Sequence, residues 1–481
     1  MIKGKTTLRF KDKETGKTLR VYKKENMVTN AYRNIIEPNF VSSANGGGIG
    51  NIASTYTPLR GLFGGVLLFD NEVDTNTIIP TKNEFSHFIG CAGGDYSGDS
   101  VVRGYLDASQ CEFKNDYIKE VFVFGLDKCN HEIKTIGLSS VAGGACGLSK
   151  LDDTDTSFFS GYATSRVLNQ SSTCNVGYGQ CNFVIPYVVV EEDGNLIGTD
   201  KDGNLVCVKH NGNNNITIKK FKYKGKLGFI DTIREFDGIG DYPTTFESLS
   251  SNGLYEMVMD LNITIPCEIV ANSKDLTILD NYIYSCKSLE NGAFIVAKID
   301  ISESNTKIYY GTIETDITSV EECKTIGNEI YATNDTNLYV IKLPELTTGG
   351  STHSCIYNRI VMLENNMIPI PFKDTVLLLS KNPCEANTSQ NIYFLTNNNS
   401  LLLQKIKYGN STSGQAFRSI CFNLSEPLVG LVCEGIVDGR EVDTISVNVV
   451  NPYLSTINVL TTAQYKPATE QLEITYELTM T

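Results

Sequence analysis

A degenerate repeat in the middle of the chain constrains the fold more than any other feature of this sequence. Each unit is an apolar strand, a turn rich in Asn, Asp and Gly, and a second strand that usually ends in Lys-Ile, Lys-Leu or a close variant. Short strands joined by such turns are typical of antiparallel β-structure rather than of helices. The unit markers, with spacings of 48, 38, 47 and 62 residues, are Ile197, Thr245, Ile283, Ile330 and Ile392.

This spacing favours a β-propeller, whose blades repeat about every 40–50 residues with paired central strands. The sheet of one blade cannot bury both of its faces alone, so neighbouring blades stack around a common axis. Residues 183–440 are therefore predicted to form a β-propeller-like domain of about five or six blades. An array of β-sandwiches is the alternative interpretation of the same repeat.

Both ends of the chain follow the two-residue period of half-buried strands. Residues 6–10 and 18–22 alternate on either side of a turn at 14–17. We expect residues 1–182 and 441–481 to form one β-sandwich-like domain, because both segments share this strand-rich pattern. The alternation is clearest near the C-terminus, at Leu472, Ile474, Tyr476 and Leu478.

The chain as a whole is therefore expected to be all-β, with the propeller-like domain inserted between the two parts of the sandwich-like domain. One short helix is expected, beginning at Thr29 or Asn30 and ending near Ile36, before Pro38. The glycine-rich segment 45–51 lacks the flanking elements and the spacing of a phosphate-binding loop, so we interpret it as a connecting loop.

The charge balance argues against nucleic acid and anionic membranes as partners. The formal net charge is −14 and the pI is about 4.9, so the surface repels phosphates. Basic residues do gather between Lys3 and Arg33, and we interpret them as the solvated face of a hairpin. Because no run of 18 apolar residues and no apolar leader is present, we expect no membrane insertion and no export.

Metal and cofactor sites are not predicted. The 14 cysteines form no C-x-x-C pair and mostly lie in apolar strands, which indicates reduced thiols that pack as small hydrophobes. His131 follows Cys129 closely, but the second pair that structural zinc requires is missing. Residues 200–204 are similar to the first half of a calcium loop, yet Leu205 replaces its glycine, and a hairpin turn explains the segment.

The sequence contains no nucleophile elbow, Cys/His nucleophile motif or P-loop, and we predict that the protein is not an enzyme. Tyrosine in propeller loops suits binding instead, because its ring stacks on sugars while its hydroxyl forms hydrogen bonds. An ordinary strand-end tyrosine is the alternative at each position. The candidate ligand-binding residues are Tyr242, Tyr309, Tyr310, Tyr357 and Tyr408.

Both chain ends resemble a family of tail-associated proteins from phages of Gram-positive bacteria. The likeness covers about residues 1–165 and 450–481 and leaves the inserted middle uncovered. One departure is that residues 121–124 read Val-Phe-Val-Phe where family members often have Trp. The segments that carry the resemblance are residues 1–8, 25–31, 61–71, 103–105, 137–144 and 472–479.

The resemblance implies a virion protein of the tail tip, baseplate or fibre, made in the bacterial host cytoplasm and assembled as a homotrimer or another symmetric ring. Other phage tail or baseplate proteins would be its partners. The inserted domain is expected to bind a glycan or protein on the bacterial cell surface. The alternatives are a purely structural baseplate role, a virion-associated polysaccharide depolymerase and a non-viral adhesin.

Overall fold

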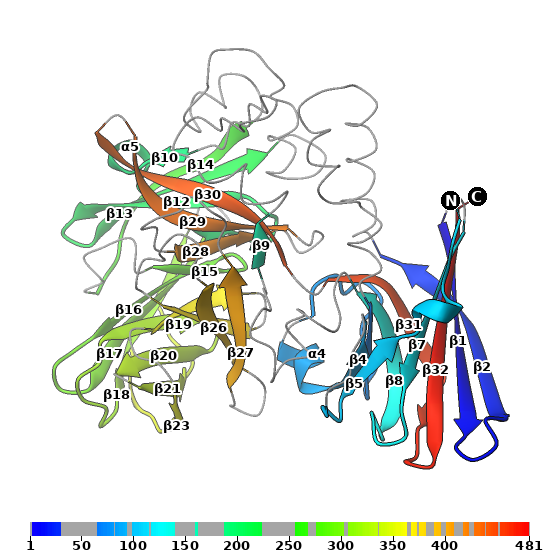
Figure 1. Ribbon diagram of the computed structural model, residues 1–481. Coiled ribbons are helices and arrows are strands. Elements are labelled where there is room, and N and C mark those ends of the chain that lie inside the picture. Colours follow the sequence, from blue (N-terminus) through cyan, green and yellow to red (C-terminus); the bar gives the residue numbers. More distant parts are fainter. Residues whose placement is uncertain are drawn as a thin grey trace.

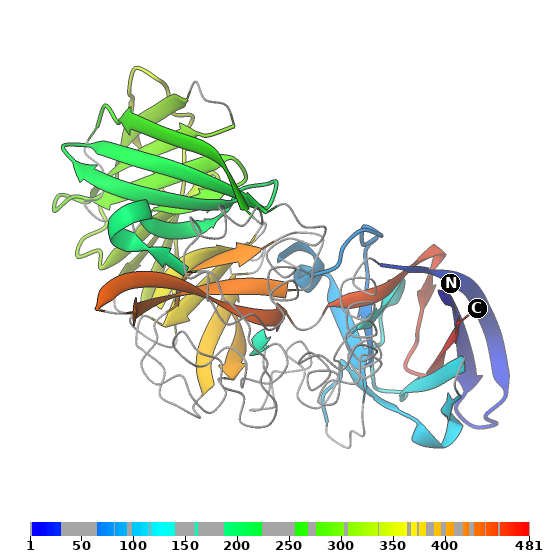
Figure 2. The ribbon, with the colours of Figure 1, turned by 90° about the horizontal axis from the view of Figure 1, so that it is seen from above.

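The computed structural model describes a chain built almost entirely of strands, which confirms the all-β prediction. The helical segments within the described residues are α4 (Lys82–Ser86), α5 (Val190–Asp193) and the 3-10 turn η1 (Ala108–Gln110). The strands form two lobes, one of which contains both chain ends (Figures 1 and 2). The described residues are 2–29, 65–80, 82–93, 99–114, 117–139, 159–161, 187–223, 255–267, 276–302, 306–334, 336–362, 367–372, 375–380, 389–395, 401–407, 417–422, 428–437, 439–450 and 453–480.

The lobe that contains the chain ends is a closed barrel of nine strands. Its strand order is β32-β1-β2-β31-β8-β3-β4-β5-β7, and β32 also pairs with β7. Neighbours are antiparallel except β4 and β5, and β6 (Glu112–Phe113) adds to the edge of β7. The nine strands are β1 (Ile2–Asp12), β2 (Thr18–Val28), β3 (Gly65–Phe69), β4 (Phe88–Ala92), β5 (Arg103–Leu106), β7 (Tyr117–Phe124), β8 (Glu132–Ser139), β31 (Leu454–Tyr465) and β32 (Glu470–Met480).

This closure corrects the expected β-sandwich. The first strand pairs with the last along its whole length, from Ile2↔Met480 to Asp12↔Glu470, so the chain ends lie side by side (Figure 1). The last strand then pairs with β7 on its other edge, from Leu472↔Phe124 to Thr479↔Tyr117. A sheet that pairs its last edge with its first has no free edge and becomes a barrel instead of two stacked layers.

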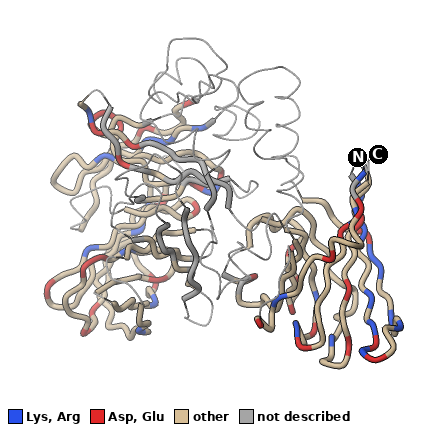
Figure 3. Tube along the Cα trace, viewed as in Figure 1, with Lys and Arg blue, Asp and Glu red and all other residues tan. Residues whose placement is uncertain are grey.

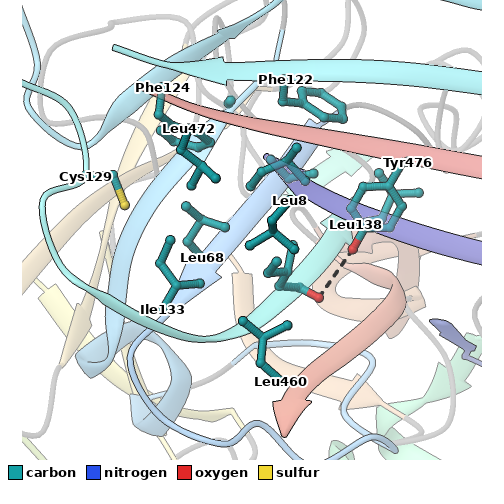
Figure 4. Packing of buried hydrophobic residues seen from close by; sticks show 14 of the residues in the cluster. Leu8, Leu68, Phe122, Phe124, Cys129, Ile133, Leu138, Leu460, Leu472 and Tyr476 are labelled. Carbon is teal, nitrogen blue, oxygen red and sulfur yellow. Dashed lines mark hydrogen bonds between the residues drawn. The ribbon is translucent and has the colours of Figure 1, made fainter. Parts of the chain in front are cut away.

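The barrel core follows from strand alternation. Leu472, Ile474 and Tyr476 point inward and are buried, and their register partners on β7 include Phe122 and Phe124. Figure 4 shows these side chains converging with those of β1, β3 and β8. The Tyr476 hydroxyl donates to the Ile136 carbonyl at 3.4 Å, which satisfies the polar end of a fully buried ring.

The second lobe contains four-stranded antiparallel sheets, each formed by consecutive strands of the inserted segment. We number the sheets in chain order, and β22 (Thr352–Ser354) adds to the edge of sheet 2. Sheet 1 is β11 (Asn195–Thr199), β12 (Leu205–Gly212), β13 (Asn215–Tyr223) and β14 (Tyr255–Thr264); sheet 2 is β15 (Thr277–Leu279), β16 (Tyr282–Ser288), β17 (Ala293–Asp300) and β18 (Lys307–Glu314); sheet 3 is β19 (Glu322–Ile326), β20 (Glu329–Asn334), β21 (Asn337–Lys342) and β23 (Tyr357–Val361).

The remaining strands form one nine-stranded sheet in which two parts can be distinguished. Sheet 4 and sheet 5 are joined by β9 (Phe159–Gly161), which pairs with β27 and with β30. Sheet 5 also receives β10 (Tyr187–Val189), which pairs with β30 although it precedes sheet 1 in the chain. Sheet 4 is β24 (Met367–Phe372), β25 (Thr375–Ser380), β26 (Ser389–Leu395) and β27 (Leu401–Lys407), and sheet 5 is β28 (Phe417–Phe422), β29 (Leu428–Val437) and β30 (Arg440–Val450).

The first strands of the five sheets contact one another in cyclic order, β11, β15, β19, β24 and β28, and β28 contacts β11. Gly198 lies where three of them meet: a Cβ there would be 2.7 Å from Cγ2 of Ile278 and 3.2 Å from the Ile420 carbonyl oxygen. Apolar clusters fill the spaces between sheets 1 and 2, between 2 and 3, and between 3 and 4.

Some sequence-based assignments fall elsewhere in this arrangement. The residues that follow the Thr245 marker belong to β14, the fourth strand of sheet 1, and do not open a sheet of their own. The strands β9 and β30 pair within the second lobe, although residues 159–161 and 441–450 were assigned to the domain of the chain ends. The predicted helix beyond Thr29 and the loop 45–51 lie outside the described residues.

Candidate functional site

Two of the predicted ligand-binding tyrosines, Tyr309 and Tyr310, are neighbours on β18 and therefore face opposite sides of sheet 2. Tyr310 packs on the core between sheets 1 and 2, and its ring lies so close to Gly350 that a Cβ there would be 2.7 Å from Cε2. Tyr309 packs on the core between sheets 2 and 3 together with Tyr357. The structure thus brings Tyr309 and Tyr357 together and separates Tyr310 from them.

Tyr242 and Tyr408 lie outside the described residues. We therefore built the candidate site around Tyr309 and Tyr357. We call it the rim: the outer edges of sheets 2 and 3, made of Tyr309, Tyr339, Ile356, Tyr357, Arg359 and Val361.

A single stretch of chain forms both outer edges of the rim. Within it, β22 pairs in parallel with β18. After two intervening residues the chain continues as β23, which pairs with β21 in antiparallel register. Ile356 lies between these two strands, where neither sheet covers it, and is 92% exposed. Val361 at the end of β23 is 67% exposed. The crossing from one sheet to the next thus leaves two large aliphatic side chains in solvent.

Aromatic rings and one guanidinium lie beside these aliphatic groups. The rings of Tyr339 and Tyr357 meet edge to face with centroids 5.3 Å apart. Arg359 is the register partner of Tyr339, and its Nε donates to Oδ1 of Asn337 at 2.8 Å. Burial and a hydrogen bond to the Asp316 carboxylate raise the pKa of the Tyr357 hydroxyl above its ordinary value.

A second aromatic group with a cation lies on the face of sheet 2 that carries Tyr309. Tyr284, Lys298 and Tyr309 occupy one register row across β16, β17 and β18. The Lys298 ammonium lies 4.0 Å from the centre of the Tyr282 ring and 5.9 Å from that of Tyr284. Tyr284 is buried, but Tyr282 and Tyr309 are half-buried, and such rings beside a cation attract both flat apolar faces and anionic groups.

The rim has the composition of a binding surface. Tyr and Arg are the residues that dominate binding energy in protein interfaces, and exposed aliphatic groups supply apolar area. Within the described residues, β23 pairs with β21 alone, so its other edge presents backbone donors and acceptors. Ile356 and Val361 escaped the sequence analysis because an apolar residue in a polar segment carries no signal of its exposure.

In the segment that is similar to a calcium loop, the Asp200 carboxylate binds a turn and an ammonium group. Oδ1 of Asp200 accepts hydrogen bonds from the backbone N–H groups of Asp202 at 3.0 Å and Asn204 at 2.9 Å. Its Oδ2 pairs with the buried Lys220 ammonium at 3.1 Å, and Lys220 also donates to the Ile301 carbonyl at 2.6 Å. A turn and an ammonium therefore occupy the oxygens that a metal ion would need.

One tyrosine–carboxylate pair has the composition of a catalytic group but not its properties. Tyr331 donates a hydrogen bond to Glu329, the pairing that a tyrosine nucleophile would require. Tyr331 is only 3% exposed, however, and burial and the Glu329 carboxylate raise its pKa, whereas a nucleophile needs a lowered pKa. In the described parts of the chain, no three His, Cys, Asp or Glu residues are arranged to hold a metal ion.

Eight cysteines of the described part are free thiols, and no described helix is long and apolar enough to cross a membrane. The free thiols are Cys91, Cys111, Cys129, Cys207, Cys267, Cys286, Cys323 and Cys355.

Comparison with known proteins identifies no relative. No protein-family model matches the chain, and no curated protein matches it. Among solved structures, the chain is similar to Kluyveromyces lactis Hsv2, with 9% identity, 51% of this chain and 71% of that chain covered, and a TM-score of 0.23. Trypanosoma rangeli sialidase in complex with sialic acid aligns at 7% identity over 81% of this chain and 60% of that chain, with a TM-score of 0.28. Similarities this low carry no argument about function.

Proposed function

We propose that the protein is a structural and adhesion component of a bacteriophage tail. In this proposal the barrel formed by both chain ends docks in the tail, and the second lobe contacts the surface of the bacterial host. The separation of two lobes supports a division of labour, because the barrel contains both termini while the second lobe is a single insertion. The resemblance of the chain ends to phage tail proteins supplies the virion context.

We further propose that the second lobe is a five-bladed β-propeller. The cyclic contacts among β11, β15, β19, β24 and β28 support this architecture, with one four-stranded sheet as each blade. The pairing of β10 with β30 supports it as well, since a strand from the start of the insertion then completes the last blade. In that arrangement the ring would be held closed by backbone hydrogen bonds between the two ends of the repeat.

The single observation that carries the adhesion role is the exposed rim. Contiguous apolar patches on a protein surface mark interaction sites, and Ile356 and Val361 add exposed aliphatic area beside the half-buried tyrosines of the rim. The edge formed by β18 and β23 lies at the lower left of the second lobe in Figure 1, away from the barrel. A cell-surface glycan or protein is the expected ligand, because tyrosine rings stack on sugars and exposed strand edges pair with peptide.

Retention of fluorescently labelled full-length protein on cells and isolated walls of Gram-positive bacteria tests the adhesion role. We expect Ile356→Ser combined with Tyr357→Ala to lower retention by about tenfold or more, as loss of a binding hot spot does. The matched control is Val101→Ser, which removes a side chain that is 64% exposed on the barrel. Equal retention of the rim variant and the control would show that the rim is not the adhesion surface.

The same experiment separates the alternatives. If the wild-type protein is retained on no host, while antibody labelling still places it on phage tails, it has a purely structural role. Release of reducing ends from wall polysaccharide by the purified protein would instead identify a depolymerase. Absence of the protein from phage particles would contradict the virion assignment.

A further inference from the structure

The second strand of the barrel, β2, has its polar and apolar faces inverted. The register pairs Leu8↔Tyr22 and Phe10↔Arg20 place Arg20 and Tyr22 on the inward face, beside the core residues of β1. The alternate residues point outward, and they include Leu19 at 55%, Val21 at 50% and Met27 at 53% exposure. A strand on the wall of a water-soluble barrel normally shows the opposite pattern.

The inward polar groups have a clear purpose within the barrel. Backbone pairing between β2 and β31 is confined to Met27↔Ile457 and Val28↔Thr456, so the two strands diverge below that point. Side chains connect β2 and β31 where the strands diverge: Lys24 donates to the Val459 carbonyl, and the Tyr22 hydroxyl accepts from the Thr461 N–H at 3.1 Å. The guanidinium of Arg20 lies 3.8 Å above the Phe10 ring. These contacts with β31 explain why the inward face of β2 is polar. They do not explain why its outward face is apolar.

Other outward apolar residues of the same barrel are covered. Leu67, Cys91 and Ile457 point outward from β3, β4 and β31 and are fully buried in a second cluster together with Val73. The segment that follows β3 supplies this cover, and the Ile78 carbonyl accepts a hydrogen bond from the Leu454 N–H at 2.7 Å. Among the described residues, none covers the outward apolar side chains Leu19, Val21 and Met27 in this way.

Charge indicates what would cover it. Residues 2–28 contain nine Lys and Arg against three Asp and Glu, whereas the remainder of the chain contains 32 against 52. Lys23 and Glu25 lie among the outward apolar residues of β2, and Lys5 on the neighbouring strand is paired with Glu477 of β32 at 3.6 Å. The basic residues along the hairpin are blue in Figure 3. A basic, apolar hairpin on an otherwise acidic chain is complementary to a second copy of that chain.

We propose that the outward face of β2 is an assembly surface that docks onto an acidic face of a second copy of this protein. Two hairpins of equal positive charge repel each other, so the contact joins different faces of the two copies. A contact between unlike faces repeats from copy to copy and closes into a ring when the rotation allows it. The inference rests on the proposed assembly role of the barrel and names the surface responsible for it.

Light scattering on the full-length protein, at about 10 μM and at low and high salt, tests this surface. We expect an oligomer at low salt that weakens by at least tenfold in dissociation constant at high salt. The triple variant Leu19→Ser, Val21→Ser, Met27→Ser should be monomeric, and the charge variant Lys23→Glu should also weaken association. The matched control Val101→Ser should associate as the wild type does.

Several results would overturn the proposal. A wild-type protein that stays monomeric at both salt concentrations, or an oligomer that persists in the triple variant, would do so. The variant Val21→Cys distinguishes a contact between unlike faces from a contact between like faces. Rapid disulfide dimerisation through the new cysteine would reveal a contact between like faces and would contradict the proposal. Thermal unfolding shows whether the triple variant folds. If the triple variant misfolds, the charge variant still tests the proposal. Retention on host cells is measured in parallel, so failure of assembly is distinguished from failure of adhesion.

Discussion

The barrel and the second lobe reach closure by different physical means. Every neighbouring pair of strands in the barrel shares backbone hydrogen bonds, including the last strand with β7. In the second lobe, sheets 1, 2 and 3 are separate hydrogen-bonded units held side by side by apolar clusters. A strand of the closed barrel cannot be altered in length or register without disturbing its pairing on both sides. The outer strand of a separate sheet can change without disturbing the pairing in the neighbouring sheet. Under the proposed function, this difference would suit the barrel to assembly and the second lobe to contacts with the host.

Buried carboxylates differ between the interior of the barrel and the second lobe, whereas Glu473 on the outer face of the barrel is buried and paired with Arg9 and Lys11. Glu120 points into the barrel, is only 5% exposed, and its Oε2 has no hydrogen-bond partner. Two buried carboxylates of the second lobe have partners instead: Asp200 pairs with the Lys220 ammonium, and Oδ2 of Asp443 accepts a hydrogen bond from the N–H of Leu196 at 2.8 Å. Burial therefore disfavours the charged form of the Glu120 carboxyl inside the barrel. In the second lobe, the partners of Asp200 and Asp443 stabilise the charged carboxylates and connect neighbouring strands.

The largest expected effect concerns Glu120. Burial raises the pKa of this carboxyl from 4.5 to about 8, so the folded barrel binds a proton that the unfolded chain releases above pH 4.5. The barrel should therefore lose stability as pH rises from about 5 to 8, by up to about 4 kcal/mol. Urea unfolding of Glu120→Gln should show no such loss, while Glu132→Gln, at an exposed site, should behave as the wild type does. Equal pH dependence in Glu120→Gln would contradict this assignment.

The next effect tests the paired charges of the second lobe. Lys220→Met leaves the Asp200 carboxylate buried beside Ile301 without its cation, which should destabilise the second lobe by about 3 kcal/mol. Lys222→Met is the control, since that side chain is exposed on the same strand. Hydrogen exchange followed by mass spectrometry should locate the loss in sheets 1 and 2 and leave the barrel unchanged. A loss shared by both lobes would mean that they unfold as one unit.

A smaller effect is expected where the first and last sheets of the second lobe meet. Asp443→Ala removes a fully buried carboxylate that accepts from the Leu196 N–H and from Nδ2 of Asn195 at 3.2 Å. We expect a loss of about 2 kcal/mol, seen as faster hydrogen exchange in β10, β11 and β30. The control is Asp202→Ala in an exposed turn. Unchanged exchange in β10 would show that this carboxylate does not hold the two ends of the repeat together.

Much of the local structure could be read from the sequence. Alternation at Leu472, Ile474 and Tyr476 gave the correct inward face of β32, and the turn at Asp202 and Gly203 joins β11 to β12 as its composition indicates. These features depend on neighbours within a few residues. Of the predicted binding residues in the described part, Tyr309 and Tyr357 share one cluster, whereas Tyr310 packs on the opposite side of sheet 2.

The sequence by itself determined the all-β class, the strands and the turns, because hydrophobic period and turn chemistry are local properties. Only the tertiary structure decided that the chain ends close a barrel, that β10 pairs with β30, and that Ile356 and the outward face of β2 remain exposed. An alternating strand presents one apolar face in a sandwich and in a barrel alike. Which strand covers which face depends on contacts between residues hundreds of positions apart, and no local pattern records them.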